Sequence, residues 1–313
     1  MMTNRTWVNG EPSHYQLRDI TKFPDWKNII VWDAFFNNLA GGFYVFLILS
    51  WFFGASRIPS MNFLLPFGLT LGLAVLFFDL ALLIFDLGDP FRFIHALRVF
   101  HPTSVLSVGV WALSTFALSL SIVVGLAWLM YISSVTTNFM QPYFYGVTTT
   151  MKVFTAFAFI AACVVLCYKG VVFSASAQPG VKEGRWLTTW MVSDAMLMGS
   201  GLFVIFAFCM GAYGAIFAAG IPMCVLIVIR CIGFYLLWLN TRDRAKKFYT
   251  GGQNVSIFLI VFVVAGILPF VLNFFGPIAT TIAGILVLIA GVWERYWLIG
   301  MTKPLYGENA DLT

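Results

Sequence analysis

Charged residues are scarce in this chain. Asp, Glu, Lys and Arg make up 10% of its 313 residues, against about a quarter in a soluble domain. Apolar residues make up 60%, and the mean hydropathy is +0.90. These values exclude an ordinary soluble domain and predict a membrane protein. The apolar runs are long and unbroken, without the short alternating segments of a β-barrel, so they predict transmembrane helices.

Residues that bind metals are also few. The three histidines are at positions 14, 95 and 101, outside every apolar run, which excludes a haem held by two buried histidines. The five cysteines lie inside apolar runs without a CxxC pair, which argues against a zinc site, an iron–sulfur cluster or a disulfide framework. No basic patch interleaved with aromatic residues indicates nucleic-acid binding. We therefore expect no metal site, haem or iron–sulfur cluster in this chain.

The apolar runs divide the chain into three parts. Residues 1–32 form a polar N-terminal tail, residues 33–300 an all-α, eight-transmembrane-helix bundle, and residues 301–313 a C-terminal tail. We expect residues 33–173 and 187–300 to form four helices each. The predicted spans are 33–54, 62–87, 105–131, 147–173, 187–212, 214–239, 254–276 and 277–300.

Several residues predict how these helices begin, turn or bend. Tyr213-Gly214 and Gly276-Pro277 predict tight turns between neighbouring spans. Ser104 is expected to cap the third span. Pro222 and Pro269 are expected to kink the sixth and seventh spans, because proline removes a helical hydrogen bond.

Basic residues are distributed unevenly between the two sides of the membrane. Eight spans place both termini on one side, here called the terminal face. Of the 18 Lys and Arg residues, all but Arg57, Lys152 and Arg230 lie on this face or at span ends beside it. The positive-inside rule then predicts a cytoplasmic terminal face. A basic periplasmic surface for docking a partner is the alternative.

Ionisable residues inside the spans point to function, since charges are expensive in lipid. Asp79, Asp194 and Arg230 are predicted to share one depth, and Arg230 is expected to pair with Asp194 or Asp79. Together with Lys152, these residues are compatible with two roles. One is a staple between helices, and the other is a charge or proton path through the membrane.

A second set of polar residues is predicted nearer the terminal face. Asp33, Asp86, Tyr168 and Arg295 come from four different spans, and Asn37 lies one turn beyond Asp33. Each residue taken singly also has an ordinary structural role. Asp33 could cap its helix, Tyr168 could be a tyrosine at the membrane interface, and Arg295 could be a cation that reaches toward the headgroups. Their convergence at one depth predicts a shallow polar pocket.

The loop after the second span carries a recognisable motif. The stretch DLGDPFRFIHALRVFHPTSVLSVGVW, residues 86–111, resembles the NrfD/PsrC family, the quinone-interacting membrane subunits of polysulfide-reductase-like complexes. Residues 39–42 (LAGG), 168–170 (YKG) and 295–300 also resemble segments of that family. Within the first stretch the matching positions are Asp86, Leu87, Gly88, Pro90, Arg92, Phe93, Pro102, Ser104, Ser107, Gly109 and Trp111.

The resemblance implies a multi-pass subunit of the bacterial inner membrane that takes part in electron transport, as in anaerobic respiration. Such a subunit binds menaquinone or ubiquinone, or the quinol, near one face. It exchanges electrons with an iron–sulfur subunit that serves a catalytic, often molybdopterin, subunit. Asp33, Asp86, Tyr168 and Arg295 match family positions around the quinone pocket, and Asn37 lies beside them. Quinone chemistry would then occur in this chain without a redox metal of its own. A proton- or ion-translocating subunit and a simple membrane anchor are the alternatives.

The loop itself adds further expectations. Residues 91–98 have the spacing of a short amphipathic helix lying on the membrane surface. His95 and His101 are candidates for relaying protons to the pocket. The chain also departs from the family pattern, with Asp89 where Arg is common and Lys169 where Thr is common.

Overall fold

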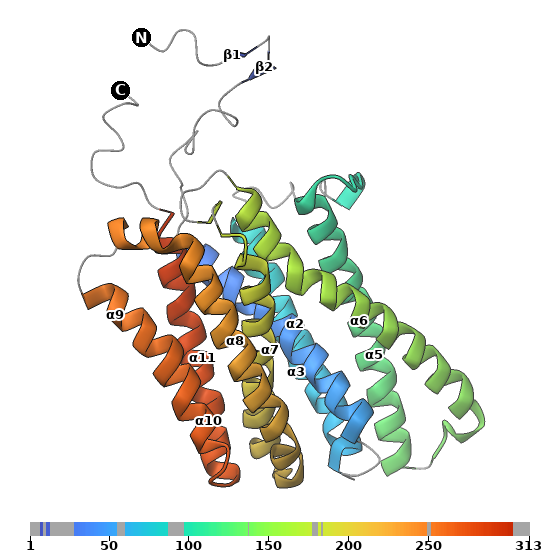
Figure 1. The fold of residues 1–313 in the computed structure, drawn as a ribbon. Coiled ribbons are helices and arrows are strands. Elements are labelled where there is room, and N and C mark those ends of the chain that lie inside the picture. The colour runs from blue at the N-terminus through green and yellow to red at the C-terminus, as the bar shows by residue number, and fades with distance from the viewer. Residues whose placement is uncertain are drawn as a thin grey trace.

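The fold is a bundle of long helices (Figure 1). The structure is a computed structural model that describes residues 7–8, 11–12, 28–54, 60–86, 97–136, 138–176, 181–182, 184–248 and 252–302. Within them, eight helical segments are long and apolar enough to cross a bilayer, which confirms the predicted all-α, eight-span architecture. The predicted surface helix over residues 91–98 falls mostly outside the described residues.

Seven spans are single helices, and the remaining one is composite. The seventh span joins α9 (Gly252–Phe258), the π-helix η2 (Leu259–Ile267) and α10 (Leu268–Leu272). The short elements are the 3-10 turn η1 (Gln141–Tyr143), which directly precedes α6, and an antiparallel pair, β1 (Trp7–Val8) with β2 (Glu11–Pro12). The single helices are α2 (Asn28–Gly54), α3 (Ser60–Asp86), α5 (Val105–Val135), α6 (Phe144–Ala175), α7 (Leu187–Cys209), α8 (Tyr213–Phe248) and α11 (Pro277–Gly300).

The helices form two groups that pack against each other mainly through α2 and α7. The first group contains α2, α3, α5 and α6, and the second contains α7, α8, α11 and the composite span (Figure 1). The most extensive contact between the groups is the packing of α2 on α7, and α6 on α7 and α11 on α2 also join them. Because α2 contacts both groups, it is largely enclosed by protein.

Glycines allow α2 and α7 to touch through their backbones. A Cβ atom placed on Gly42 would lie 1.9 Å from the carbonyl oxygen of Ala195, and one on Gly199 would lie 2.2 Å from the backbone of Gly42. Lipid gives helices no hydrophobic reason to associate, so close backbone packing of this kind holds membrane bundles together. The LAGG segment therefore joins the two helix groups.

Two helix starts agree with the sequence, and one turn does not. The Ser104 side chain accepts a hydrogen bond from the backbone N–H of Ser107 at 3.4 Å, which confirms the predicted cap of α5. Gly276 has φ 100° directly before α11, as the predicted turn requires. The turn predicted at Tyr213-Gly214 is wrong. The chain reverses instead at Gly211, where φ is 69°, and Tyr213 already belongs to α8.

Proline affects the two predicted kink sites differently. Pro222 lies inside α8, whose assigned helix continues on both sides of it. Pro269 directly follows the π-helical stretch, which ends with the Leu268 N–H bonded to the carbonyl of Val263, five residues back. Pro269 has no N–H to return to the carbonyl of Ala265, so a regular α-helical hydrogen bond is missing there. The wider π-helical turns accommodate that gap.

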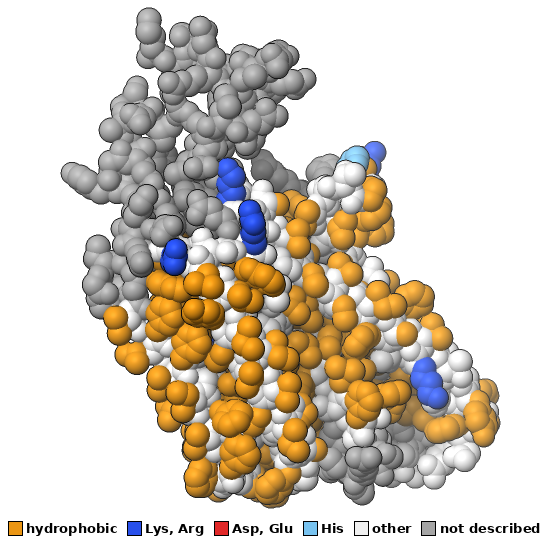
Figure 2. All heavy atoms as spheres, in the orientation of Figure 1, with side chains coloured by type: hydrophobic (Ala, Val, Ile, Leu, Met, Phe, Trp, Pro, Cys, Tyr) orange, Lys and Arg blue, Asp and Glu red, His pale blue; other side chains and the backbone are white. Residues whose placement is uncertain are grey.

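The outer surface of the bundle is apolar. Large side chains such as Phe52, Phe85 and Ile221 are more than 70% exposed. Figure 2 shows apolar side chains covering the helical part of the face in view, with basic side chains mostly toward one end. This distribution fits a surface bathed in lipid between two aqueous sides.

Candidate functional site

Acidic side chains are enclosed by the bundle. The four Asp and Glu residues whose side chains the structure describes within the spans, Asp33, Asp79, Asp194 and Glu294, are each at most 3% exposed. Together with buried cations they form two clusters on opposite sides of α2. The first cluster consists of Asp33, Asn37, Asp79, Tyr168 and Lys169. The second cluster consists of Asp194, Arg230, Glu294 and Arg295.

The first cluster joins three helices of the first group. The Lys169 ammonium of α6 forms an ion pair and a hydrogen bond with Oδ2 of Asp33 on α2. One turn further along α2, Asn37 Nδ2 donates to Oδ2 of Asp79 on α3 at 2.9 Å. The carboxyl groups of Asp33 and Asp79 also interact electrostatically with each other and with Lys169. All four groups therefore belong to one buried polar network.

The aromatic ring of Tyr168 packs against this network. Its side chain is buried, and the Lys169 Nζ lies 5.4 Å from the centre of its ring. A Cβ atom on Gly109 of α5 would lie 2.2 Å from the Tyr168 ring, so only glycine leaves room for the ring there. The glycine of the loop motif thus holds open the space that the tyrosine occupies.

The first cluster lies at a shallow depth. Asp33 is five residues from the start of α2, and Asp79 is seven residues from the end of α3. At 1.5 Å per residue these separations correspond to about 8 and 11 Å. Both helix ends belong to the terminal face, so the cluster is close to water while remaining buried.

Several acceptor atoms in the first cluster have no hydrogen-bond partner. They are Asp33 Oδ1, Asn37 Oδ1 and Asp79 Oδ1. A buried oxygen that lacks a partner costs free energy, on the order of 1–3 kcal/mol. The first cluster therefore has unused capacity to bind a hydrogen-bond donor or a proton.

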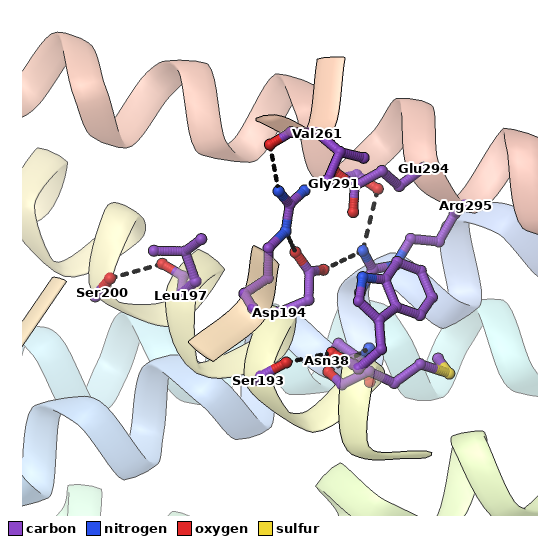
Figure 3. Close-up of polar contacts among 12 residues, drawn as sticks. Asn38, Ser193, Asp194, Leu197, Ser200, Val261, Gly291, Glu294 and Arg295 are labelled. Atoms are coloured by element: carbon purple, nitrogen blue, oxygen red, sulfur yellow. Dashed lines mark hydrogen bonds and ion pairs between the residues drawn. The ribbon is translucent and has the colours of Figure 1, made fainter. Parts of the chain in front are cut away.

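The second cluster binds the second helix group together (Figure 3). Asp194 of α7 accepts from Arg230 Nε of α8 at 3.2 Å, and its other oxygen pairs with Arg295 of α11. Arg230 also pairs with Glu294 of α11. The Arg230–Asp194 contact confirms the ion pair predicted from the sequence. Two carboxylates thus face two guanidinium groups, and their formal charges cancel.

The π-helix and an aromatic ring complete the second cluster. Arg230 donates to the carbonyl oxygen of Val261 in η2 at 2.7 Å (Figure 3). The guanidinium of Arg295 lies 5.4 Å from the centre of the Trp190 ring and donates to the Gly291 carbonyl at 3.2 Å. These contacts tie α7, α8, η2 and α11 together, as expected of a staple between helices.

Helix α2 separates the two clusters and faces both of them. Asn37 points to Asp79, while the adjacent Asn38 donates to the Met191 carbonyl of α7 at 3.5 Å. Phe35 packs near Gly291 of α11: a Cβ atom placed on Gly291 would lie 3.5 Å from the Phe35 ring. Aromatic and amide side chains therefore lie between the two sets of charges.

Comparison with known protein families identifies the family of this chain. A family model described as polysulphide reductase, NrfD, matches residues 21–302, nearly the whole chain. The chain belongs to the NrfD family. Proteins of the NrfD family are integral membrane subunits of respiratory oxidoreductase complexes. Comparison with curated proteins yields no significant match.

The structure brings together only part of the pocket expected for an NrfD protein. Asp33, Asn37 and Tyr168 lie in one cluster as expected, and Asp79 joins them. Arg295, which was expected beside them, instead pairs with Asp194. The reason is the rotation of α11, which turns Arg295 toward α7.

The remaining predicted residues lie elsewhere. The side chain of Asp86 and all of His95 fall outside the described residues. His101 is exposed at the terminal face, where its backbone N–H donates to Ser107 Oγ at 3.0 Å. Lys152 is exposed near the start of α6, toward the opposite face and far along the helix from Lys169.

Two cluster members were not predicted as site residues. Lys169 was noted only as a departure from the family pattern, and Glu294 lies within the predicted eighth span without an assigned role. Each falls on the buried stripe of its helix, at four-residue spacing from buried neighbours such as Val165 and Phe173, or Ala290 and Leu298. That periodicity is the signal that could have identified them.

Proposed function

We propose that this NrfD-family protein is the quinone- or quinol-binding subunit of its complex and exchanges electrons with an iron–sulfur partner subunit. The observation that carries the proposal is the first cluster. It combines buried hydrogen-bond donors, unpartnered acceptors and an aromatic ring at a depth of about 8–11 Å from an aqueous face.

The side chains of the first cluster suit both forms of the substrate. A quinone has carbonyl oxygens that accept hydrogen bonds, and Lys169 and Tyr168 supply N–H and O–H donors. A quinol has hydroxyl groups that donate, and the unpartnered oxygens of Asp33 and Asp79 can accept from them. The reaction adds or removes two protons as well as two electrons, so carboxyl groups beside the substrate serve as proton donors and acceptors.

The same argument favours the terminal face as the side on which the electron partner docks. The first cluster is near that face, and Arg98, Lys182, Arg185 and Arg242 are exposed there. Figure 2 shows basic side chains at this end of the helical bundle. An acidic surface on an iron–sulfur subunit would complement them. A molybdopterin enzyme is the first candidate for the catalytic subunit behind it, and the bacterial inner membrane is the proposed location.

The alternative of proton or ion translocation draws on the second cluster. Its charges are buried in the membrane, as those of a proton path would be. Their formal charges balance, however, and they contact one another, so a staple between helices accounts for them. Of the other two members of the predicted path, Asp79 lies in the first cluster and Lys152 is exposed near the opposite face. The quinone role therefore has the stronger support.

A tyrosine pair offers a matched test. In the assembled complex, Tyr168→Phe is expected to reduce quinol-linked turnover at least tenfold, whereas reaction of the catalytic subunit with an artificial dye persists. Tyr44→Phe is the control, because Tyr44 is a buried tyrosine whose hydroxyl donates to the Thr155 carbonyl at 3.2 Å, far along α2 from the first cluster. If the Tyr168→Phe and Asp33→Asn variants both kept normal quinol turnover, the quinone assignment would be rejected. A simple membrane anchor would also show no binding of quinone analogues.

A further inference from the structure

The two buried clusters differ in their charge balance. The second cluster has two carboxylates and two guanidinium groups, which sum to zero when all are ionised. Among the residues that the structure describes, the first cluster has two carboxyl groups, Asp33 and Asp79, and one cation, Lys169. Full ionisation of these described groups would leave one negative charge that Lys169 does not balance.

The contacts of the two carboxyl groups are also unequal. Asp33 has the Lys169 ammonium as a direct partner. Asp79 is fully buried, and its hydrogen-bond partner Asn37 is a neutral amide at 2.9 Å. The two carboxyl groups belong to one buried network, in which Asp33 lies one helical turn from Asn37, the partner of Asp79, and each has an Oδ1 without a hydrogen-bond partner. Two neighbouring buried carboxylates repel each other, whereas a neutral carboxylic acid beside a carboxylate does not.

We propose that Asp33 and Asp79 hold one proton between them at neutral pH, mainly on Asp79, and that Lys169 neutralises the remaining negative charge. The proton belongs to the pair, as expected for two strongly interacting acids. Burial favours this state because a group that cannot be paired in lipid becomes neutral. Lys169, where Thr is common in the family pattern, thereby limits the pair to a single proton.

The use of this proton rests on the proposed function. Reduction of a quinone to a quinol adds two electrons to the quinone and one proton to each of its two carbonyl oxygens. The electrons would come from the iron–sulfur partner, and the carboxyl pair would supply one proton to one oxygen. The pair would then be fully ionised beside Lys169 and would be reloaded from water at the terminal face. The second proton must reach the other oxygen by a separate route.

Neighbouring titratable groups must be separated from the pair in any test. Tyr168 on α6 is buried and interacts with Lys169. On the elements packed against α2, the ionisable side chains of Asp194, Arg230, Glu294 and Arg295 are balanced among themselves. Asp86 is two turns nearer the terminal face on α3, and its side chain is outside the described residues. Asp86→Asn is therefore part of the experiment.

Infrared spectroscopy of the purified full chain tests the proton directly, without turnover. Aspartate labelled with ¹³C at the side-chain carboxyl separates its acid band from lipid esters and from glutamate. The wild type should show one protonated aspartate per chain at neutral pH, with a shift in heavy water. Asp79→Asn and Asp33→Asn should each abolish the band, because one carboxylate then balances Lys169. Lys169→Met should roughly double it, because both acids then become neutral.

The controls make every outcome informative. Glu294→Gln, a change in the charge-balanced second cluster, should leave the aspartate band unchanged. Size-exclusion profiles and circular dichroism establish that each variant is folded, and the wild-type band decides the question if Asp79→Asn fails to fold. Absence of the wild-type band overturns the proposal. So does a band that survives both Asp33→Asn and Asp79→Asn, or one that is lost only in Asp86→Asn. Normal quinol turnover in Tyr168→Phe and Asp33→Asn would reject the quinone role while leaving the proton site intact.

Discussion

Removing the negative charge of Asp194 is expected to destabilise the second helix group strongly. This carboxylate is the shared partner of Arg230 and Arg295, and all three side chains are at most 1% exposed. In Asp194→Asn two buried guanidinium groups would face Glu294 alone, leaving one positive charge without a partner. Breaking a buried ion pair from one side costs about 3–5 kcal/mol. We expect a loss of free energy of unfolding in that range.

The measurement is reversible unfolding in mixed detergent micelles, followed by circular dichroism. Lys152→Met is the reference, because this exposed lysine should change the stability by only about 0.5 kcal/mol. The double variant Asp194→Asn/Arg295→Met restores the balance, since Arg230 would still face Glu294. It should recover at least about 1 kcal/mol relative to Asp194→Asn.

Two results would refute the charge argument. One is an Asp194→Asn variant no less stable than Lys152→Met, because a buried unpaired cation would then have no measurable effect. The other is a double variant less stable than Asp194→Asn, because the two changes would then act as independent losses of packing. Either result would mean that the helices are held together by their apolar contacts.

Two further predictions concern helix packing and orientation. Gly42→Ala should lower the unfolding free energy by about 1–3 kcal/mol, because its Cβ atom would lie 1.9 Å from the Ala195 carbonyl oxygen. Gly125→Ala on α5 is the control, since a Cβ atom there meets nothing within 4 Å, and equal stability of the two variants would contradict the prediction. A reporter active on one side of the membrane, fused to the C-terminus, should be active in the cytoplasm if the basic terminal face follows the positive-inside rule. Activity only in the periplasm would instead favour a basic docking surface on that side.

The sequence alone predicted the spans because hydropathy is a local property. A run of about 20 apolar residues must cross the bilayer as a helix whatever its neighbours are. The eight spans, the cap at Ser104 and the turn at Gly276 follow from residues adjacent in the chain. The Arg230–Asp194 pair was also predictable, because a buried charge at a given depth requires a partner at that depth.

The assignment of polar residues to clusters depended on tertiary structure. Asp33 and Arg295 lie at similar depths, yet Asp33 faces Lys169 and Arg295 faces Asp194. Depth follows from counting residues along one helix, whereas the facing direction follows from the rotation of each helix against all of its neighbours. Here the backbone contact at Gly42 sets the packing of α2 on α7, and α2 then separates the two clusters. The sequence by itself determined the spans and the depth of each polar group along them, and only the packed bundle decided which groups are buried and which of them meet.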